Sequence, residues 1–255
     1  LLDHNERKII GTIYKNQNSK KAKLKGVELV SPKIPNLIKK INQLNKKYDN
    51  LIIFCSRGGL RSKSLAEFSD LAGIEVYRLE NGYKGYRHYI MDKLQNYKFK
   101  GRLAVLHGNT GVGKTYILKE MEKMGASIID LEGIANHRGS AFGRRATPQP
   151  AQAVFENQLA SALLTKESLA CDSLFLEDES RAIGSISLPL EFHRAMSLAP
   201  IVSVEEPLEY RVETILNDYI VSNLQDFRNL TPENADSLFA DSLLGSLDRI
   251  QKRLG

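Results

Sequence analysis

Two loops, each placed directly after a short apolar run, constrain the fold of this chain more than any other feature of its sequence. The loop at residues 55–62 follows the apolar run 51–54, and the loop at 108–115 follows the run 103–106. An apolar run that leads through a loop into a helical pattern is typical of a parallel sheet, with ligands at the carboxyl ends of the strands. The sequence therefore predicts an α/β protein with two binding loops.

Helical and strand patterns alternate along most of the chain. The expected strands lie at residues 51–54, 76–79, 103–107, 127–131, 173–177 and 200–204. The expected helices start near residues 31, 65, 83, 115, 152 and 207, and a last one runs from Thr231 to Ile250. The polar stretch 93–102 interrupts the alternation. We therefore predict two parallel-sheet domains, at residues 1–98 and 99–255.

Positive charge is concentrated in the first part of the chain. Residues 1–100 carry 21 Lys and Arg against 9 Asp and Glu, whereas the rest carry 15 against 21. Such an excess of cations can gather nucleic-acid phosphates through counterion release. It is equally compatible with a solvated lysine-rich surface, so the charge alone leaves both readings open.

Composition indicates a globular protein of the cytoplasm. The chain is 42% hydrophobic and 26% charged, and it has no apolar stretch near the roughly 20 residues that a membrane span needs. Its first residues lack a secretion signal, and its two cysteines occur in dissimilar surroundings. We expect no membrane association and a reducing compartment. The sequence does not specify an oligomeric state.

The second loop has the pattern of a phosphate-binding loop. It consists of Gly108, Asn109, Thr110, Gly111, Val112, Gly113, Lys114 and Thr115. Glycines allow consecutive N–H groups to point at phosphate oxygens, while Lys114 and the helix N-terminus supply positive charge and Thr115 can hold Mg²⁺. We expect it to bind a diphosphate or triphosphate. The pattern does not specify which compound.

Acidic residues end two of the expected strands. Glu177, Asp178 and Glu179 follow one strand, with Arg181 just beyond, and resemble a Walker B segment that binds Mg²⁺ or substrate. Asp178 is the expected Mg²⁺ ligand together with Thr115. Asp130 and Glu132 end the preceding strand in a similar way. The alternative is an exposed acidic turn.

A basic, glycine-containing loop follows at residues 137–145. Its candidate contacts with diphosphate or RNA are His137, Arg138, Ser140, Arg144 and Arg145. Long basic loops within an otherwise acidic domain usually bind anions. A plain surface turn is the alternative.

The first loop surrounds Cys55 with groups that favour a thiolate. Loop N–H groups, a following helix N-terminus, and Arg57 and Arg61 all lower the pKa of a cysteine. Glycines and arginines are unusual neighbours for an inert core thiol, so we predict a reactive Cys55 and a structural Cys171. Cys-x5-Arg also occurs in cysteine phosphatases. However, Phe54 stands where those enzymes usually carry histidine, and no Asp is clearly placed as a general acid.

Taken in order, these motifs resemble those of the tRNA 2-selenouridine synthase family. The matching segments are residues 11–15, 28–31, 55–62, 80–84 with Arg87, 108–115, 130–133, 137–143, 149–150 with 155–157, and 177–184. The resemblance implies a rhodanese-like parallel-sheet domain followed by a P-loop NTPase-like parallel-sheet domain. It also favours ligand contacts by the basic loop and by the acidic segment.

The resemblance implies chemistry at the wobble uridine of tRNA. A 2-thiouridine would be geranylated on sulfur from geranyl diphosphate, and selenophosphate would then supply selenium while geranylthiol leaves. Both compounds would be co-substrates, with no tightly bound cofactor and with Mg²⁺ as an optional partner. Cys55 would be the essential cysteine, carrying selenium as a selenylsulfide, with Arg57 and Arg61 holding the selenium donor.

The chain departs from the family pattern in two ways. It lacks the strand that normally opens the rhodanese-like domain and the segment that normally follows residue 255, so we expect a chain truncated at both ends. Asn81 also replaces a usual glycine. Two alternative functions remain at this stage: a Cys-x5-Arg phosphatase or sulfurtransferase fused to a nucleotide-binding module, and a non-catalytic nucleotide-dependent RNA-binding protein.

Overall fold

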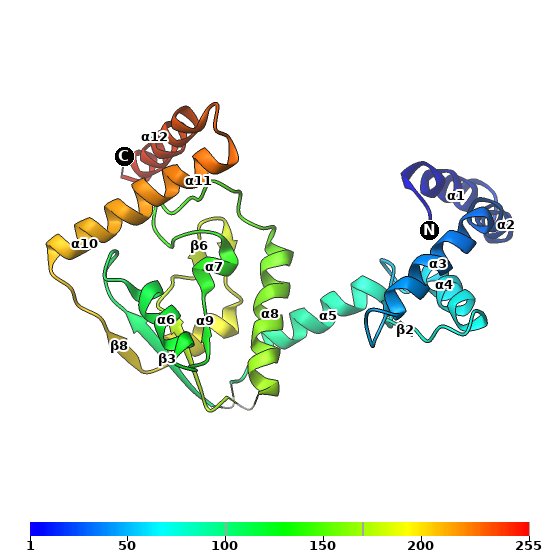
Figure 1. Ribbon diagram of the computed structural model, residues 1–255, viewed down its shortest axis with the longest axis horizontal. Helices are drawn as coiled ribbons and strands as arrows, with labels where there is room; N and C mark the ends of the chain where they lie inside the picture. The colour runs from blue at the N-terminus through cyan, green and yellow to red at the C-terminus, as the bar shows by residue number, and fades with distance from the viewer. Residues whose placement is uncertain (100, 170, 255) are drawn as a thin grey trace. The chain divides into compact units, whose positions relative to one another are not determined.

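The computed structural model describes residues 1–99, 101–169 and 171–254 (Figure 1). The chain divides into two compact units, Leu1–Tyr89 and Ile90–Gly255. The division falls inside helix α5, Gly82–Gln95, and so lies before the boundary predicted at residue 98. The protein is α/β with parallel sheets, as the sequence predicts.

The first unit consists mainly of helices. Its elements are α1 (His4–Asn16), α2 (Ser19–Val30), a 3₁₀ turn (Ser31–Lys33), α3 (Ile34–Asn45), β1 (Ile52–Ile53), α4 (Leu60–Leu71), β2 (Tyr77–Arg78) and the start of α5. Local sequence explains the helix starts, because Asp3 and Glu6 form a capping box and Asn18 accepts a hydrogen bond from the Lys21 N–H. Helices α1 and α2 are not among those that the sequence pattern predicts.

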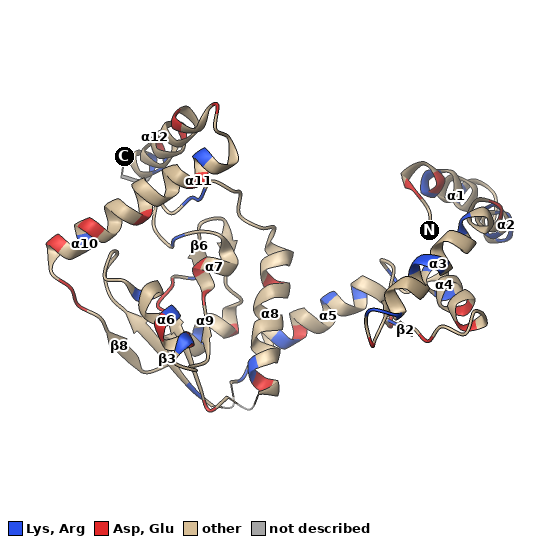
Figure 2. Cartoon of the chain, in the orientation of Figure 1, with Lys and Arg blue, Asp and Glu red and all other residues tan. Residues whose placement is uncertain are grey.

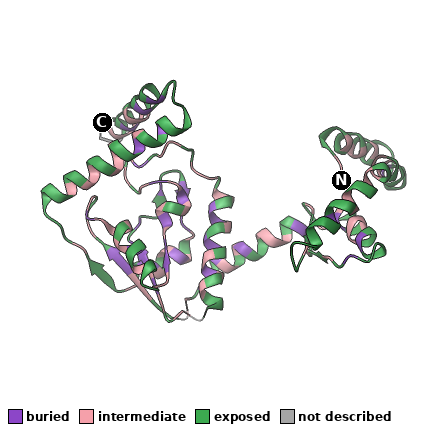
Figure 3. Cartoon of the chain, in the orientation of Figure 1, coloured by how far each residue is buried: buried purple, intermediate pink, exposed green. Residues whose placement is uncertain are grey.

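The strand predicted at residues 51–54 is shorter and more exposed than expected. Only Ile52 and Ile53 form β1, which pairs in parallel with β2 in a two-stranded sheet among the described residues. Ile52 is 61% exposed and Phe54 58% exposed. The apolar sequence 51–54 suggests a buried strand, and that interpretation is wrong, because a sheet of two strands offers little surface to bury them against. Figure 3 shows how much more of the first unit than of the second is exposed.

Lysine and arginine are spread over the helices of the first unit (Figure 2). Residues 1–89 contain 18 Lys and Arg and 8 Asp and Glu. In the parts of the chain that the structure describes, no helix has both the length and the apolar character needed to cross a lipid bilayer.

The second unit is built on a four-stranded parallel sheet of order β4-β5-β3-β8. Its strands are β3 (Arg102–His107), β4 (Ile128–Ile129), β5 (Ser173–Glu177) and β8 (Ile201–Ser203). The strand predicted at 173–177 is confirmed with both of its ends. Because β5 and β3 lie side by side in the centre, the acidic segment and the phosphate loop leave the sheet at the same edge.

Helices and a small hairpin complete the second unit. These elements are α6 (Lys114–Lys123), α7 (Leu131–Ala135), α8 (Gln152–Ser168), the β6–β7 hairpin (Ala182–Ile183 and Ile186–Ser187) and α9 (Leu190–Ser197). Helix α6 packs on β4 and β5, and α9 packs on β3. Leu106, Leu118 and Ile128 form one part of the core, with Phe175 against it. Burial of this apolar surface holds α6 against the sheet, and so holds in place the strand ends from which the phosphate-binding loop and the acidic segment emerge.

The chain continues into helices α10 (Leu208–Ile215), a π-helical turn (Leu216–Val221), α11 (Ser222–Leu230) and α12 (Ala235–Leu254). Phe227 of α11 packs edge-on against Phe239 of α12, with ring centroids 5.8 Å apart. The last helix was predicted to start at Thr231. Thr231 instead ends α11, where its hydroxyl donates to the Phe227 carbonyl at 3.2 Å, and α12 begins at Ala235.

Candidate active site residues in the two units

Cys55 lies in the loop between β1 and α4, one residue after Phe54 and half-buried. Its Sγ is 3.3 Å from the Ser62 hydroxyl, and Ser62 itself is 1% exposed. Burial raises the pKa of the thiol, but hydrogen bonds from the Ser62 hydroxyl and from the backbone N–H groups of Ser62, Arg57 and Gly59 outweigh it, so that the pKa falls to about 7. Cys55 therefore has substantial thiolate character near neutral pH.

The origin of this pKa differs in part from the prediction. Arg57 contributes through its backbone N–H, while the leading side-chain contribution comes from Ser62. Of the three predicted causes, the loop N–H groups are among those that lower the pKa, whereas the arginine side chains are not among the leading ones. Ser62 is the last residue of the loop 55–62. The sequence does not indicate that its side chain is buried against the thiol.

The segment after β2 supports the cysteine loop. The Tyr83 N–H donates to the Cys55 carbonyl at 2.9 Å, and the Lys84 N–H donates to the Ser56 carbonyl at 2.9 Å. A Cβ on Gly82 would collide with the Cys55 carbonyl oxygen, and Gly82 has a φ of +59°. The neighbouring Asn81 is also left-handed, with a φ of +53°. This conformation explains why glycine suits position 81 and why asparagine is an acceptable replacement.

The phosphate-binding loop joins β3 to α6 in the expected strand–loop–helix arrangement. Gly108, Gly111 and Gly113 all have positive φ angles. The Lys114 ammonium donates to the Gly108 carbonyl at 2.7 Å, which curls the side chain over the loop. With α6 starting at Lys114, the loop presents N–H groups and a cation to an anion.

Helix α10 rests directly on this loop. A Cβ on Gly111 would lie 2.6 Å from the Arg211 carbonyl oxygen, and the Arg211 Nε donates to the Thr110 carbonyl at 3.1 Å. Tyr116 of α6 hydrogen-bonds Asp218 of the π-helical turn. The π-helical turn therefore lies against α6, next to the phosphate-binding loop. Local sequence patterns do not indicate this contact.

One pocket collects most of the predicted residues of the second unit. Beyond the loop glycines, its lining includes the predicted residues Thr110, Lys114, Thr115, Arg138, Ser140, Arg145 and 177–179, whereas Asn109 and Val112 of the loop do not line it. It also includes residues that the sequence analysis did not name as site residues, which are Tyr116, Lys119, Ser180, Thr214, Asp218, Tyr219 and Ser222. The pocket is therefore lined by both cations and carboxylates.

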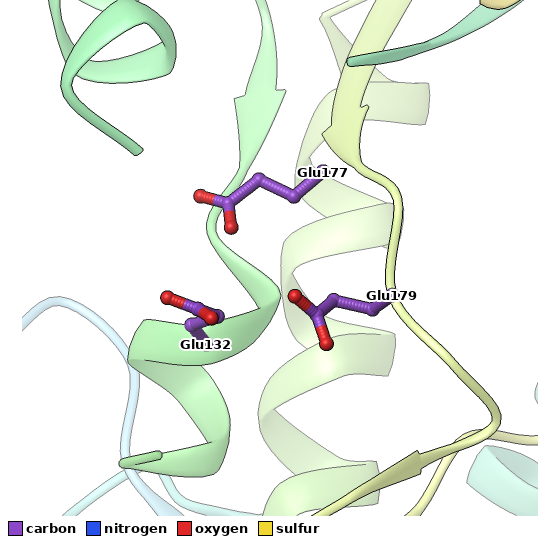
Figure 4. A group of neighbouring side chains, drawn as sticks. All are labelled: Glu132, Glu177 and Glu179. Carbon is purple, nitrogen blue, oxygen red and sulfur yellow. The ribbon is translucent and has the colours of Figure 1, made fainter. Parts of the chain in front are cut away.

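The acidic segment splits between two environments. Glu177 is 1% exposed and Glu179 is 8% exposed, whereas the side chain of Asp178 is 45% exposed. Side chains alternate along an extended chain, so Asp178 points the other way and contacts His107 Nδ1 at 2.6 Å. Asp178 still lines the pocket, but the close carboxylate group is Glu132, Glu177 and Glu179 (Figure 4).

These three carboxylates repel one another in a buried setting. Burial, followed by the charge of Glu132, raises the pKa of Glu177 to about 8, although a hydrogen bond from Thr115 opposes the shift. Burial and the charges of Glu132 and Glu177 raise the pKa of Glu179 to about 8 as well. Burial also raises the pKa of Glu132, against a hydrogen bond from the Gly139 backbone.

The basic loop is folded on itself by a bridge between His137 and Arg144. Arg138 lies over the Tyr219 ring, 5.5 Å from its centroid. Buried guanidinium nitrogens, Nη1 of Arg138 and Nε of Arg145, have no hydrogen-bond partner among the described residues. Because an unpaired buried donor is costly, these groups are suited to accepting an anion in the pocket.

Three of the predicted substrate or tRNA contacts, His137, Arg144 and Arg181, do not line this pocket. His137 is 5% exposed, and burial together with the charge of Arg144 lowers its pKa, so a neutral His137 supports the loop from beneath. His137 does not line the pocket, and its contact with a ligand stays a prediction. Arg144 and Arg181 are exposed and do not line the pocket. Cys171 contacts the Ser127 hydroxyl at 2.9 Å and remains predicted as structural.

Known proteins of one family match this chain over its whole length. A family model described as the tRNA 2-selenouridine synthase AAA domain matches residues 101–255. A tRNA 2-selenouridine synthase of Pseudomonas syringae pv. tomato is 41% identical over 100% of this chain and 69% of its own length. The chain belongs to the tRNA 2-selenouridine synthase family.

Other members of the tRNA 2-selenouridine synthase family match to the same extent. The proteins of Azotobacter vinelandii and Marinobacter nauticus are 40% and 38% identical, each over 100% of this chain. A solved structure, the N-terminal domain of a putative ATP/GTP binding protein from Clostridium difficile 630, is 41% identical and covers 35% of this chain, with a TM-score of 0.34. That score is too low to support a structural inference.

Proposed function

We propose that this chain converts 2-thiouridine at the wobble position of tRNA into 2-selenouridine. Relatives named tRNA 2-selenouridine synthase match all of the chain at 38% to 41% identity. The structural observation that carries the proposal is the presence, in one member of this family, of a polarised thiol loop and a separate phosphate pocket. The enzyme is a transferase that acts on tRNA.

The first step that we propose is geranylation of the base. The sulfur of 2-thiouridine forms a bond to C1 of geranyl diphosphate, the C–O bond to diphosphate breaks, and the base loses its N3 proton. Alkylation turns the sulfur at C2 into a better leaving group. The selenium of selenophosphate then forms a bond to C2, and the C2–S bond breaks to release geranylthiolate, which takes up a proton. Water cleaves the Se–P bond and phosphate leaves.

The phosphate pocket is suited to hold the diphosphate of the prenyl donor. Lys114 and the N–H groups of its loop stabilise the negative charge that grows on the leaving diphosphate. Arg138 and Arg145 bring unpartnered buried N–H donors to the same pocket, as judged over the described residues. A diphosphate that is displaced rather than hydrolysed would use the same cradle as a nucleotide.

The first unit would serve the selenium step and the tRNA. We infer that it is a rhodanese-like half whose Cys55 thiolate is required for the selenium step, with Arg57 and Arg61 close to the selenium donor. Its excess of 18 cations over 8 acids in residues 1–89 is favourable for binding tRNA phosphates.

Nucleoside mass spectrometry tests this proposal. Thiolated tRNA is incubated with the protein, geranyl diphosphate and selenophosphate, and the modified uridines are measured after digestion. We expect selenouridine from the wild type and from Cys171→Ser, and only geranylated thiouridine from Cys55→Ser. Selenouridine made by Cys55→Ser would overturn the role of this thiol.

Two further assays with the same protein variants test the two alternative functions. Release of phosphate from an aryl phosphate, lost in Cys55→Ser, would indicate a Cys-x5-Arg phosphatase. Binding of tRNA without any change in the nucleoside would indicate a non-catalytic RNA-binding protein.

A further inference from the structure

Three glutamates from two strand ends meet beside the phosphate-binding loop. Glu132 comes from the first turn of α7, and Glu177 and Glu179 come from the end of β5 (Figure 4). One carboxylate oxygen of each lies within 4.8 Å of the others. The carboxyl groups point toward a common centre from separate parts of the chain.

The cluster contains a buried group whose hydrogen-bonding capacity is not used. Glu177 is 1% exposed, and its Oε1 has no hydrogen-bond partner among the residues that the structure describes. The Thr115 hydroxyl of the phosphate-binding loop hydrogen-bonds the Glu177 side chain. Burying a carboxylate without a partner is costly, so Glu177 calls for a cation or a proton.

The oxygen set is the kind that divalent cations prefer. Mg²⁺ and Ca²⁺ are bound by carboxylate oxygens at about 2.0 to 2.6 Å, so two ligand oxygens on opposite sides of one ion are separated by about 4 to 5 Å. The carboxylate oxygens of the three glutamates lie within 4.8 Å of one another, which fits that range. Glu132, Glu177 and Glu179 all line the pocket that also contains Lys114, so phosphate oxygens can complete the coordination.

Asp178 is less suited to this role, although its position in the sequence suggested it. Its carboxylate lies on the opposite side of the chain and contacts His107 Nδ1 at 2.6 Å. The two candidate sets thus make different predictions for single substitutions.

We propose that Glu132, Glu177 and Glu179 form a binding site for one divalent cation of the Mg²⁺ or Mn²⁺ class, next to the phosphate-binding loop. The contact between this cation and a diphosphate rests on the proposed function, but binding of the cation by itself does not. The competing explanation is a proton shared between Glu132 and Glu179, which requires no metal.

Titration with Mn²⁺ tests the site directly. Electron paramagnetic resonance of free Mn²⁺ is measured at pH 8.5 with the full chain, without tRNA, because ligand carboxylates must be ionised to bind a metal. We expect one site in the wild type, and at least about tenfold weaker binding in Glu179→Gln. Asp178→Asn is the matched control, and we expect it to bind Mn²⁺ as the wild type does.

Each other outcome contradicts the proposal. Absence of Mn²⁺ binding by the folded wild type would favour the shared proton. Equal binding of Mn²⁺ by Glu179→Gln and the wild type, or loss of binding in Asp178→Asn alone, would show that Asp178 and not the three glutamates binds the metal.

Thermal unfolding distinguishes a variant that has lost metal binding from one that does not fold. Glu179→Gln removes one of three repelling carboxylates, so we expect it to melt at or above the wild-type temperature without metal. Mn²⁺ should raise the melting temperature of the wild type but not that of Glu179→Gln or Glu177→Gln. Because tRNA and geranyl diphosphate are absent, failure of this test leaves the proposed function intact, and failure of nucleoside modification leaves the cation site intact.

Discussion

The two units stabilise negative charge by different physical means. In the first unit, Cys55 is polarised mainly by backbone N–H groups and one buried hydroxyl, on a small sheet with exposed apolar residues. In the second, charged side chains from separated segments converge in one pocket above a larger sheet. The comparison teaches that the thiol loop depends on backbone shape, whereas the phosphate pocket depends on side-chain charge.

The largest effect should come from removing the central charge of the pocket. Lys114→Ala should lower geranyl transfer at least about 100-fold, since a preorganised donor to the departing diphosphate is lost. Lys123→Ala is the matched control, because Lys123 is an exposed lysine of the same helix that pairs with Glu120. Quantifying geranylated thiouridine checks the effect. Equal activity of the two variants would contradict the dependence on charge.

The thiol loop should instead be sensitive to backbone shape. Gly82→Ala places a Cβ against the Cys55 carbonyl at a φ of +59° and should destabilise the fold by about 1 to 3 kcal/mol. Gly73→Ala has a similar φ of +70° but meets nothing within 4 Å, so it should cost only about 1 kcal/mol. Urea unfolding compares the two variants. An equal cost would show that the contact with Cys55 does not matter.

The pH dependence of the thiol separates hydrogen bonding from arginine charge. The Cys55 pKa of about 7 means that alkylation by iodoacetamide should accelerate as the pH rises through 7, where the thiolate forms. Ser62→Ala should move this midpoint upward by about one pH unit, since it removes a hydrogen bond to the thiolate. Arg57→Ala keeps the backbone N–H and should shift it less. The reverse order would show that arginine charge is the main cause.

The smallest effect concerns Asn81. Asn81→Gly should stabilise the fold by less than about 1 kcal/mol, because glycine adopts the φ of +53° without a side-chain penalty. Asn81→Ala, its counterpart, should destabilise the fold by about 1 kcal/mol. Denaturant midpoints measure both, and a stabilising alanine would refute the argument from backbone conformation.

Sequence patterns predicted the elements whose structure is local. The phosphate-binding loop and β5 occur as expected because their glycines and apolar residues act on their own neighbours. The separation of Glu177 and Glu179 from Asp178 follows from strand alternation and was within reach of the sequence. The pattern at 51–54 failed because burial of Ile52 depends on neighbouring strands. Tyr219 reaches the pocket through a π-helical turn far along the chain, and no local pattern indicates that contact.

The close packing of α10 on the phosphate-binding loop has a mechanical consequence. Gly111 has no room for a side chain beside the Arg211 carbonyl, and Arg211 donates to the Thr110 carbonyl, so we expect a change in the shape of the loop to move α10 with it. We expect ligand binding at the loop to be felt by α10 and by the π-helical turn that follows it. A spectroscopic probe attached to those helices should report on it without touching the ligand.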